Sequence, residues 1–134
     1  MNEPKPIEPI SFPQPEIHDK KWGQEDGVGE IWITNNDKYC LKILKFGAGK
    51  SFSNHYHILK EETWYVESGQ LHMEYYDLAT ANPIARTLFP GMVVHIPAGN
   101  PHKLTAIKDS VIYEASSKHY EFDSYRIGKG SSQG

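Results

Sequence analysis

The feature that most constrains this chain is a pair of histidines, His55 and His57, separated by a single residue. A carboxylate, Glu62, follows five positions later, and a third histidine, His102, stands behind a Pro-x-Gly turn. Residues i and i+2 of a β-strand point to the same face, roughly 6.5 to 7 Å apart along the chain. Two imidazoles at that spacing can converge on one ion, with a neighbouring strand supplying the carboxylate and the third imidazole. The pattern therefore predicts a metal site of three histidines and one carboxylate, carried by β-strands.

Alternation along a strand favours Glu62 over the adjacent Glu61 as the ligand. In a strand that begins at Glu62, this residue shares one face with Trp64 and Val66, which makes that face the more apolar one. A carboxylate on an inner, apolar face needs a partner, and a metal ion is one.

The histidine pair is predicted to lie in a strand that is buried on both sides. The face opposite the histidines holds Phe52, Tyr56 and Ile58, and it is more apolar than the histidine face. We therefore expect the histidines to line the inside of a barrel, with a second sheet, a tail or another subunit covering the outside.

Composition predicts a single domain without nucleic-acid or membrane partners. A length of 134 residues leaves room for one core. The 14 basic and 17 acidic residues give a formal net charge of -3, which offers no electrostatic case for nucleic acid. No apolar run approaches the roughly 20 residues of a membrane helix, and the N-terminus lacks a signal pattern. Cys40, the single cysteine, is expected to be a buried strand thiol, so we expect a cytoplasmic, reducing setting.

Short runs rich in Ile, Val, Tyr, Phe and Trp alternate with Gly, Asn, Asp and Pro, which predicts an almost entirely β structure. The breaks at 35–37 and 68–69 are predicted to be hairpin turns, and residues 77–83 a longer polar connection. This arrangement favours a small antiparallel barrel or jelly roll. The candidate strands are 30–34, 38–46, 51–57, 62–67, 70–76, 84–89, 92–96, 102–107 and 110–116.

The two ends of the chain differ from its middle. Residues 1–21 carry five of the nine prolines within the first fifteen positions, which favours an extended, polyproline-like arm. Apolar residues such as Ile7 and Phe12 interrupt it, so a disordered lead-in and an arm packed on its own barrel or a partner's are both open. The ordered domain is expected over 22–127, followed by a flexible tail over 128–134.

The two histidine-bearing segments resemble the paired motifs of the cupin superfamily. The first motif is matched by Gly49, His55, His57, Glu62 and Gly69. The second is matched by Gly91, Pro97, Gly99 and His102. The Asn that closes the second motif is Ala106 here, at a position that is structural in the family. The resemblance covers roughly residues 38–116 and implies a single-domain, all-β cupin barrel of the jelly-roll type, expected to form a homodimer.

A further resemblance, over roughly residues 21–128, is to the type II mannose-6-phosphate isomerases. It is carried by the runs 21–23, 53–69, 96–102 and 112–126. Three departures leave the exact sugar open. The family's Arg between the second His and the Glu is Lys60, its Gln-x-Gly is replaced within 115–118, and its final Asp-x-Tyr-Gly-Arg is missing, with Gly-Lys-Gly at 128–130 in its place. The resemblance implies a metal-dependent aldose–ketose isomerase that acts on a sugar phosphate in carbohydrate metabolism.

The implied mechanism uses one divalent ion, held by the four ligands, to bind the substrate carbonyl and stabilise an enediolate. A general base moves the proton between adjacent carbons. Lys60 is a candidate base if burial lowers its pKa, and Glu114 and His95 are alternatives. Arg126, with Lys60 or Lys103, is the candidate for holding the phosphate. The ligand set accepts zinc, manganese, iron, cobalt or nickel.

Plainer interpretations stay open. Arg126 is also a candidate for a surface ion pair with Asp123, the two lysines for solvated side chains, and Trp22 and Trp64 for barrel core instead of an aromatic wall for a sugar. No partner pattern is seen for His18, His72 and His119. Two other functions fit the same ligands, namely a non-catalytic module that binds a sugar or sugar nucleotide and an iron-dependent cupin dioxygenase. Four intact ligands argue against a purely structural barrel.

Overall fold

The computed structural model describes residues 15–18, 23–25, 28–52 and 54–127, and over these residues the predicted all-β fold is confirmed. Among the residues described, no helix has the length and hydropathy that crossing a lipid bilayer requires. The strands are β1 (Gly23–Glu25), β2 (Val28–Asn35), β3 (Cys40–Phe46), β4 (His55–Tyr56), β5 (Glu62–Ser68), β6 (Leu71–Tyr76), β7 (Pro83–Leu88), β8 (Val93–Ile96), β9 (His102–Ala106), β10 (Ser110–Ser116) and β11 (Tyr125–Arg126).

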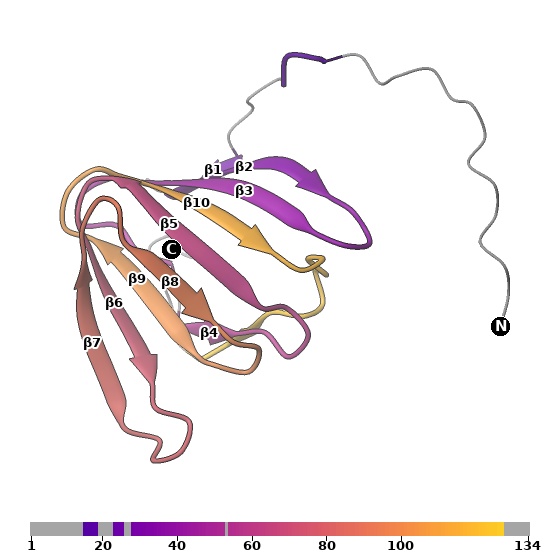
Figure 1. The fold of residues 1–134 in the computed structure, drawn as a ribbon. Helices are drawn as coiled ribbons and strands as arrows, with labels where there is room; N and C mark the ends of the chain where they lie inside the picture. Colours follow the sequence, from indigo (N-terminus) through magenta and orange to yellow (C-terminus); the bar gives the residue numbers. More distant parts are fainter. Residues whose placement is uncertain (1–14, 19–22, 26–27, 53, 128–134) are drawn as a thin grey trace, which may run out of the picture.

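The strands form two antiparallel sheets that make the two walls of a barrel (Figure 1). The six-stranded sheet has the order β1-β2-β3-β10-β5-β8, and the five-stranded sheet has the order β11-β4-β9-β6-β7. Neighbouring strands are often distant in sequence, since β10 pairs with both β3 and β5. The chain thus crosses repeatedly between the sheets, as a jelly roll does.

Strand alternation decides which side chains enter the barrel. In β5, Glu62, Trp64 and Val66 are buried while Tyr65 is exposed, which confirms the predicted inner face. The apolar core packs between the sheets and includes Trp64, and the interpretation of this tryptophan as barrel core is confirmed. Burial of such large apolar side chains contributes about 1.5–3 kcal/mol each.

The inner face of the six-stranded sheet changes character along its strands. In β3, the buried apolar side chains of Phe46 and Leu44 are followed on the same face by the buried Lys42. In β10, the buried Ile112 is followed two residues later by the buried Glu114. The barrel interior is therefore apolar at one end and charged at the other, and the charged end borders the histidines described below.

All nine predicted strands occur, with boundaries shifted by a few residues. The predicted strand over 51–57 is the most shortened, because its pairing is reduced to β4 and an isolated bridge between Ser51 and Thr105. The short edge strands β1 and β11 were not predicted. Runs of three and two residues are too short to show alternation in sequence.

One of the two predicted hairpin turns is confirmed and one is wrong. Residues 35–37 join β2 to β3, which pair directly. The turn at 68–69 instead joins β5 to β6, and these strands belong to different sheets. Gly69 has a φ of +90°, and a Cβ at this position would overlap Ser110. The turn is tight because it carries the chain from one wall of the barrel to the other.

Most of the predicted N-terminal arm over 1–21, Trp22 and the predicted tail over 128–134 lie outside the described residues. Cys40 lies inside the barrel with 1% of its surface exposed. Burial raises the pKa of its thiol. The prediction of a buried strand thiol is therefore confirmed.

Candidate metal centre

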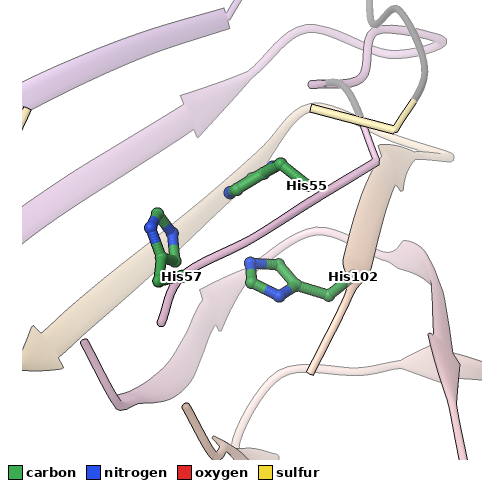
Figure 2. Close-up of side chains that lie close together, drawn as sticks. All are labelled: His55, His57 and His102. Carbon is green, nitrogen blue, oxygen red and sulfur yellow. The ribbon is translucent and has the colours of Figure 1, made fainter. Parts of the chain in front are cut away.

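Three histidines that were predicted as metal ligands come together inside the barrel (Figure 2). His55 and His102 lie directly opposite each other on β4 and β9, and His57 follows immediately after β4. A ligand nitrogen from each ring lies within 4.8 Å of those of the other two. His57 and His102 are buried and His55 is half-buried.

Backbone carbonyls decide which nitrogen of two rings faces the others. His57 Nδ1 lies 2.7 Å from the carbonyl oxygen of Asp123, and His102 Nδ1 lies 2.9 Å from that of Asn100. A carbonyl oxygen only accepts, so each Nδ1 carries the proton and donates it. Each Nε2 of the neutral ring is then an acceptor, in the form that binds a metal ion.

Burial keeps these rings neutral. It lowers the pKa of His57 to about 4, with a further decrease from the Lys60 ammonium. It also lowers the pKa of His102 to about 4, against a smaller opposing effect of the Asn100 carbonyl. At neutral pH both rings therefore offer an unprotonated Nε2 to the space between them.

Glu62 meets these nitrogens from β5, on the opposite sheet. Its Oε2 lies 3.3 Å from His102 Nε2 and 3.7 Å from His57 Nε2. Among the described residues, Glu62 Oε2 and His102 Nε2 have no hydrogen-bond partner, although both atoms are buried. Lone pairs on two imidazoles and a carboxylate thus converge with no donor between them. A divalent cation fits this donor set, because it satisfies all of these acceptors at once.

A buried lysine lies against the outer oxygen of the same carboxylate. Lys60, with 3% of its surface exposed, places Nζ 3.3 Å from Glu62 Oε1 and 3.1 Å from Glu114 Oε2. Burial lowers the lysine's pKa, but Glu114 and Glu62 together outweigh it, so the pKa is raised. The condition under which Lys60 was predicted to be a base is therefore not met, and the interpretation of Lys60 as solvated is wrong.

Glu114, the second candidate base, lies in the charged end of the barrel. Burial, followed by the neighbouring Glu62 carboxylate, raises the pKa of Glu114 to about 7, while Lys60 and Lys42 oppose the increase. Its carboxyl group therefore exchanges protons near neutral pH, which suits a general base.

His119 is a part of this cluster that sequence reasoning missed. Its Nδ1 lies 3.2 Å from Lys60 Nζ and 3.5 Å from Lys42 Nζ, and it accepts from these two ammonium groups. Burial and both lysines lower the pKa of His119 to about 3. Its backbone is held by two hydrogen bonds to the Asn35 side chain. No spacing relates position 119 to the histidine motifs, so only the tertiary structure brings it here.

Two other predicted residues lie on the opposite faces of their strands from the clustered histidines. His95 is exposed on β8, where its Nδ1 lies 3.4 Å from Thr63 Oγ1. Lys103 alternates with the buried His102 along β9 and so belongs to the outer face of that strand. These placements put His95 and Lys103 on the outer faces of their strands and not among the clustered histidines.

The alternative interpretation of Arg126, a surface ion pair with Asp123, is wrong. Asp123 is buried and accepts hydrogen bonds from the backbone amides of residues 58–60. Arg126 is exposed on β11, directly opposite His55. Cross-strand partners point to the same face, so Arg126 lies on the histidine face of the sheet.

The surroundings of the histidine pair differ from the prediction at Phe52. This ring packs inside, 4.9 Å from the ring of His55 and 6.1 Å from that of His102, because Phe52 and Asn54 do not continue the predicted strand. Tyr56 does lie on the outer side, stacked on Tyr125. Tyr125 is the cross-strand neighbour of Tyr56 in the same sheet, so this contact leaves open what covers the outer face of β4.

Metal-free protein is expected to lose stability as the pH falls from about 6.5 toward 4. His57, His102 and His119 have folded pKa values of about 4, 4 and 3 against an ordinary 6.5, so the unfolded state binds more protons in this window. Glu114 acts oppositely, because its raised pKa makes the folded state bind an extra proton between about 4.5 and 7. The loss of stability from the three imidazoles exceeds the gain from the one carboxyl group, so the net stability falls. Thermal unfolding of chelator-treated protein checks this, and a Tm at pH 5 equal to or above that at pH 7 would contradict it.

A family model for the cupin domain matches residues 42–120. Among curated proteins no match is found. Similar solved structures include CapF, a capsular polysaccharide assembling protein from Staphylococcus aureus, with 19% identity over 81% of this chain and 34% of that one and a TM-score of 0.70. Oxalate decarboxylase from Bacillus subtilis has 14% identity over 81% of this chain and 30% of that one, with a TM-score of 0.71.

KdgF from Halomonas sp. is more similar in size, with 21% identity over 76% of this chain and 89% of that one and a TM-score of 0.66. The chain spans about a third of the length of CapF and of oxalate decarboxylase. At these identities the likeness shows the fold alone. The family match extends over more than half of the chain and includes all three clustered histidines, so this chain belongs to the cupin family.

Proposed function

We propose that this protein binds one divalent metal ion through His55, His57, Glu62 and His102. The observation that carries the proposal is the convergence of lone pairs: Glu62 Oε2 and His102 Nε2 are buried 3.3 Å apart and neither has a hydrogen-bond donor among the described residues. Two like acceptors at this distance repel each other unless a cation lies between them. Zinc, manganese, iron, cobalt and nickel all suit the donor set, and oxalate decarboxylase, of the same fold, has Mn(II) centres.

We further propose that the bound ion serves an aldose–ketose isomerase acting on a sugar phosphate. The ion would supply Lewis acidity to oxygens of the substrate. Glu114 would take the proton from the carbon next to the carbonyl and return it to the neighbouring carbon, because it is the buried carboxylate beside Glu62. Lys60 would remain an ammonium and hold both carboxylates in place.

The charged end of the barrel favours a polar substrate over the apolar ligands expected of a cupin dioxygenase. Arg126 would hold the phosphate at the rim, since it lies opposite His55 on the histidine face and its guanidinium carries a permanent charge. The proposal also agrees with the sequence resemblance to type II mannose-6-phosphate isomerases across the histidine motifs.

Proton NMR in deuterated water tests this function. Metal-reconstituted protein is expected to place deuterium at the carbon next to the carbonyl of one member of a panel of aldose and ketose phosphates, mannose 6-phosphate included. Glu114→Gln should bind the ion but slow exchange by about 100-fold or more, the contribution of a positioned base. His57→Ala, which weakens metal binding, serves as the second control. A bound ion with no exchange in any sugar would overturn the isomerase and leave a sugar-binding cupin or an oxygenase.

A further inference from the structure

The loop that joins the two central metal ligands is held from the far end of the chain. His57 and Glu62 are separated by only four residues, and three of these, 58–60, turn their backbone amides toward one side chain, that of Asp123. Asp123 Oδ1 lies 2.8 Å from Ile58 N, and Oδ2 lies 3.0 Å from Leu59 N and from Lys60 N. The carboxylate thus fixes the path of the chain between the two ligands.

The same residue also orients a ligand ring. The carbonyl oxygen of Asp123 accepts the proton of His57 Nδ1 at 2.7 Å. This hydrogen bond selects the tautomer in which His57 Nε2 faces Glu62. One residue therefore controls both the loop, through its side chain, and the ring, through its backbone.

Asp123 is buried, so its hydrogen bonds to the loop belong to the folded interior and are not a surface contact. Only 1% of its surface is exposed, and no ion pair to this carboxylate occurs among the described residues. The three backbone N–H groups compensate its charge instead. Leaving a buried carboxylate without such donors costs free energy of folding. The loop and Asp123 therefore hold each other in place.

We infer that Asp123 is a positioning residue of the metal centre, which fixes the loop over 58–60 and the tautomer of His57. The inference rests on the proposed function for the metal ion itself, but the residue that it assigns, Asp123, is not one of the proposed ligands. Residues that orient metal ligands typically change metal affinity by about 10- to 100-fold when they are replaced. We expect replacement of Asp123 to lower the metal affinity within this range.

The test replaces Asp123 by Asn, which keeps the size of the side chain but turns an NH₂ group against backbone N–H donors. Asp123→Asn is expected to weaken Co(II) binding by about 10- to 100-fold, measured by competition with a chromophoric chelator, and to alter the Co(II) d–d absorption bands. Asp109→Asn is the matched control, because Asp109 also accepts from a backbone amide, that of Ala48. Asp109 follows β9 at the end opposite His102. Its replacement should therefore leave the Co(II) affinity and the absorption bands unchanged.

A second measurement needs no metal. Long-range ¹H–¹⁵N correlation of metal-free protein should show His57 with its proton on Nδ1 in the wild type and a mixture of tautomers in Asp123→Asn. In wild-type protein the amides of residues 58–60 should also be protected from hydrogen exchange, which is measurable even if the variant does not fold.

The two proposals fail in different ways. A wild-type protein that binds none of the divalent ions overturns the metal centre, while the tautomer and exchange data still decide the role of Asp123. Unchanged Co(II) affinity together with an unchanged His57 tautomer in folded Asp123→Asn overturns the positioning role. Unprotected amides at 58–60 in the wild type overturn it as well.

Discussion

Replacing His102 by Ala is expected to weaken binding of a divalent ion by about two to three orders of magnitude. Four-ligand zinc sites bind with apparent free energies of about 10–16 kcal/mol, so that one ligand in four accounts for roughly 2.5–4 kcal/mol. His102 is the most deeply buried of the three histidines, and its Nε2 is one of four buried side-chain atoms without a hydrogen-bond partner among the described residues. Isothermal titration of chelator-treated protein with Zn(II) or Co(II) measures the change.

His95→Ala is the matched control for this experiment. His95 belongs to the same sequence motif as His102, but it lies exposed on β8 beside Thr63. Its replacement should leave the affinity and the stoichiometry of one ion per chain unchanged. Equal binding by wild type and His102→Ala, or a comparable loss in His95→Ala, would show that the ion lies elsewhere.

Replacing Lys60 by Met is expected to lower the free energy of unfolding by about 3–5 kcal/mol, the range seen when one partner of a buried ion pair is removed. Methionine fills a similar volume, so the loss of charge dominates the effect. The Glu62 and Glu114 carboxylates, both buried, would then face each other without the ammonium between them. Urea unfolding of metal-free protein at pH 8, above the pKa of about 7 of the Glu114 carboxyl group, gives the largest difference.

Lys103→Met provides the control, since Lys103 lies on the outer face of β9 next to the same centre. The double variant Lys60→Met, Glu114→Gln should recover part of the loss, because it removes one of the two repelling charges. A cost below about 1 kcal/mol for Lys60→Met would place this lysine with ordinary exposed ion pairs and contradict its role.

Much of the candidate site was accessible from sequence because strand alternation is a local property. Glu62 shares a face with Trp64 and Val66, and all three are buried as expected. The motif positions of His55 and His102 place them on neighbouring strands, where the register sets them directly opposite each other. The pattern did not predict that Phe52 packs inside with the histidines, since the strand is interrupted just before β4.

The charge state of the site could not be predicted from local sequence patterns. Whether a lysine two residues before Glu62 is an ammonium or a base depends on which groups surround it. Burial alone lowers its pKa, and the contacts with Glu114, 54 positions away in sequence, and with Glu62 together reverse the sign. His119 contacts Lys60 across 59 positions, and no periodicity links the two.

The sequence by itself determined the all-β barrel, the inward face of β5 and the gathering of three histidines, because hydrophobic alternation and Gly-marked turns act over a few residues. Only the tertiary structure decided what surrounds those ligands. Asp123 reaches His57 from 66 positions away and holds the loop over 58–60. Hydrogen bonds and ion pairs of this kind depend on which strands become neighbours, and that order follows from packing the two sheets against each other.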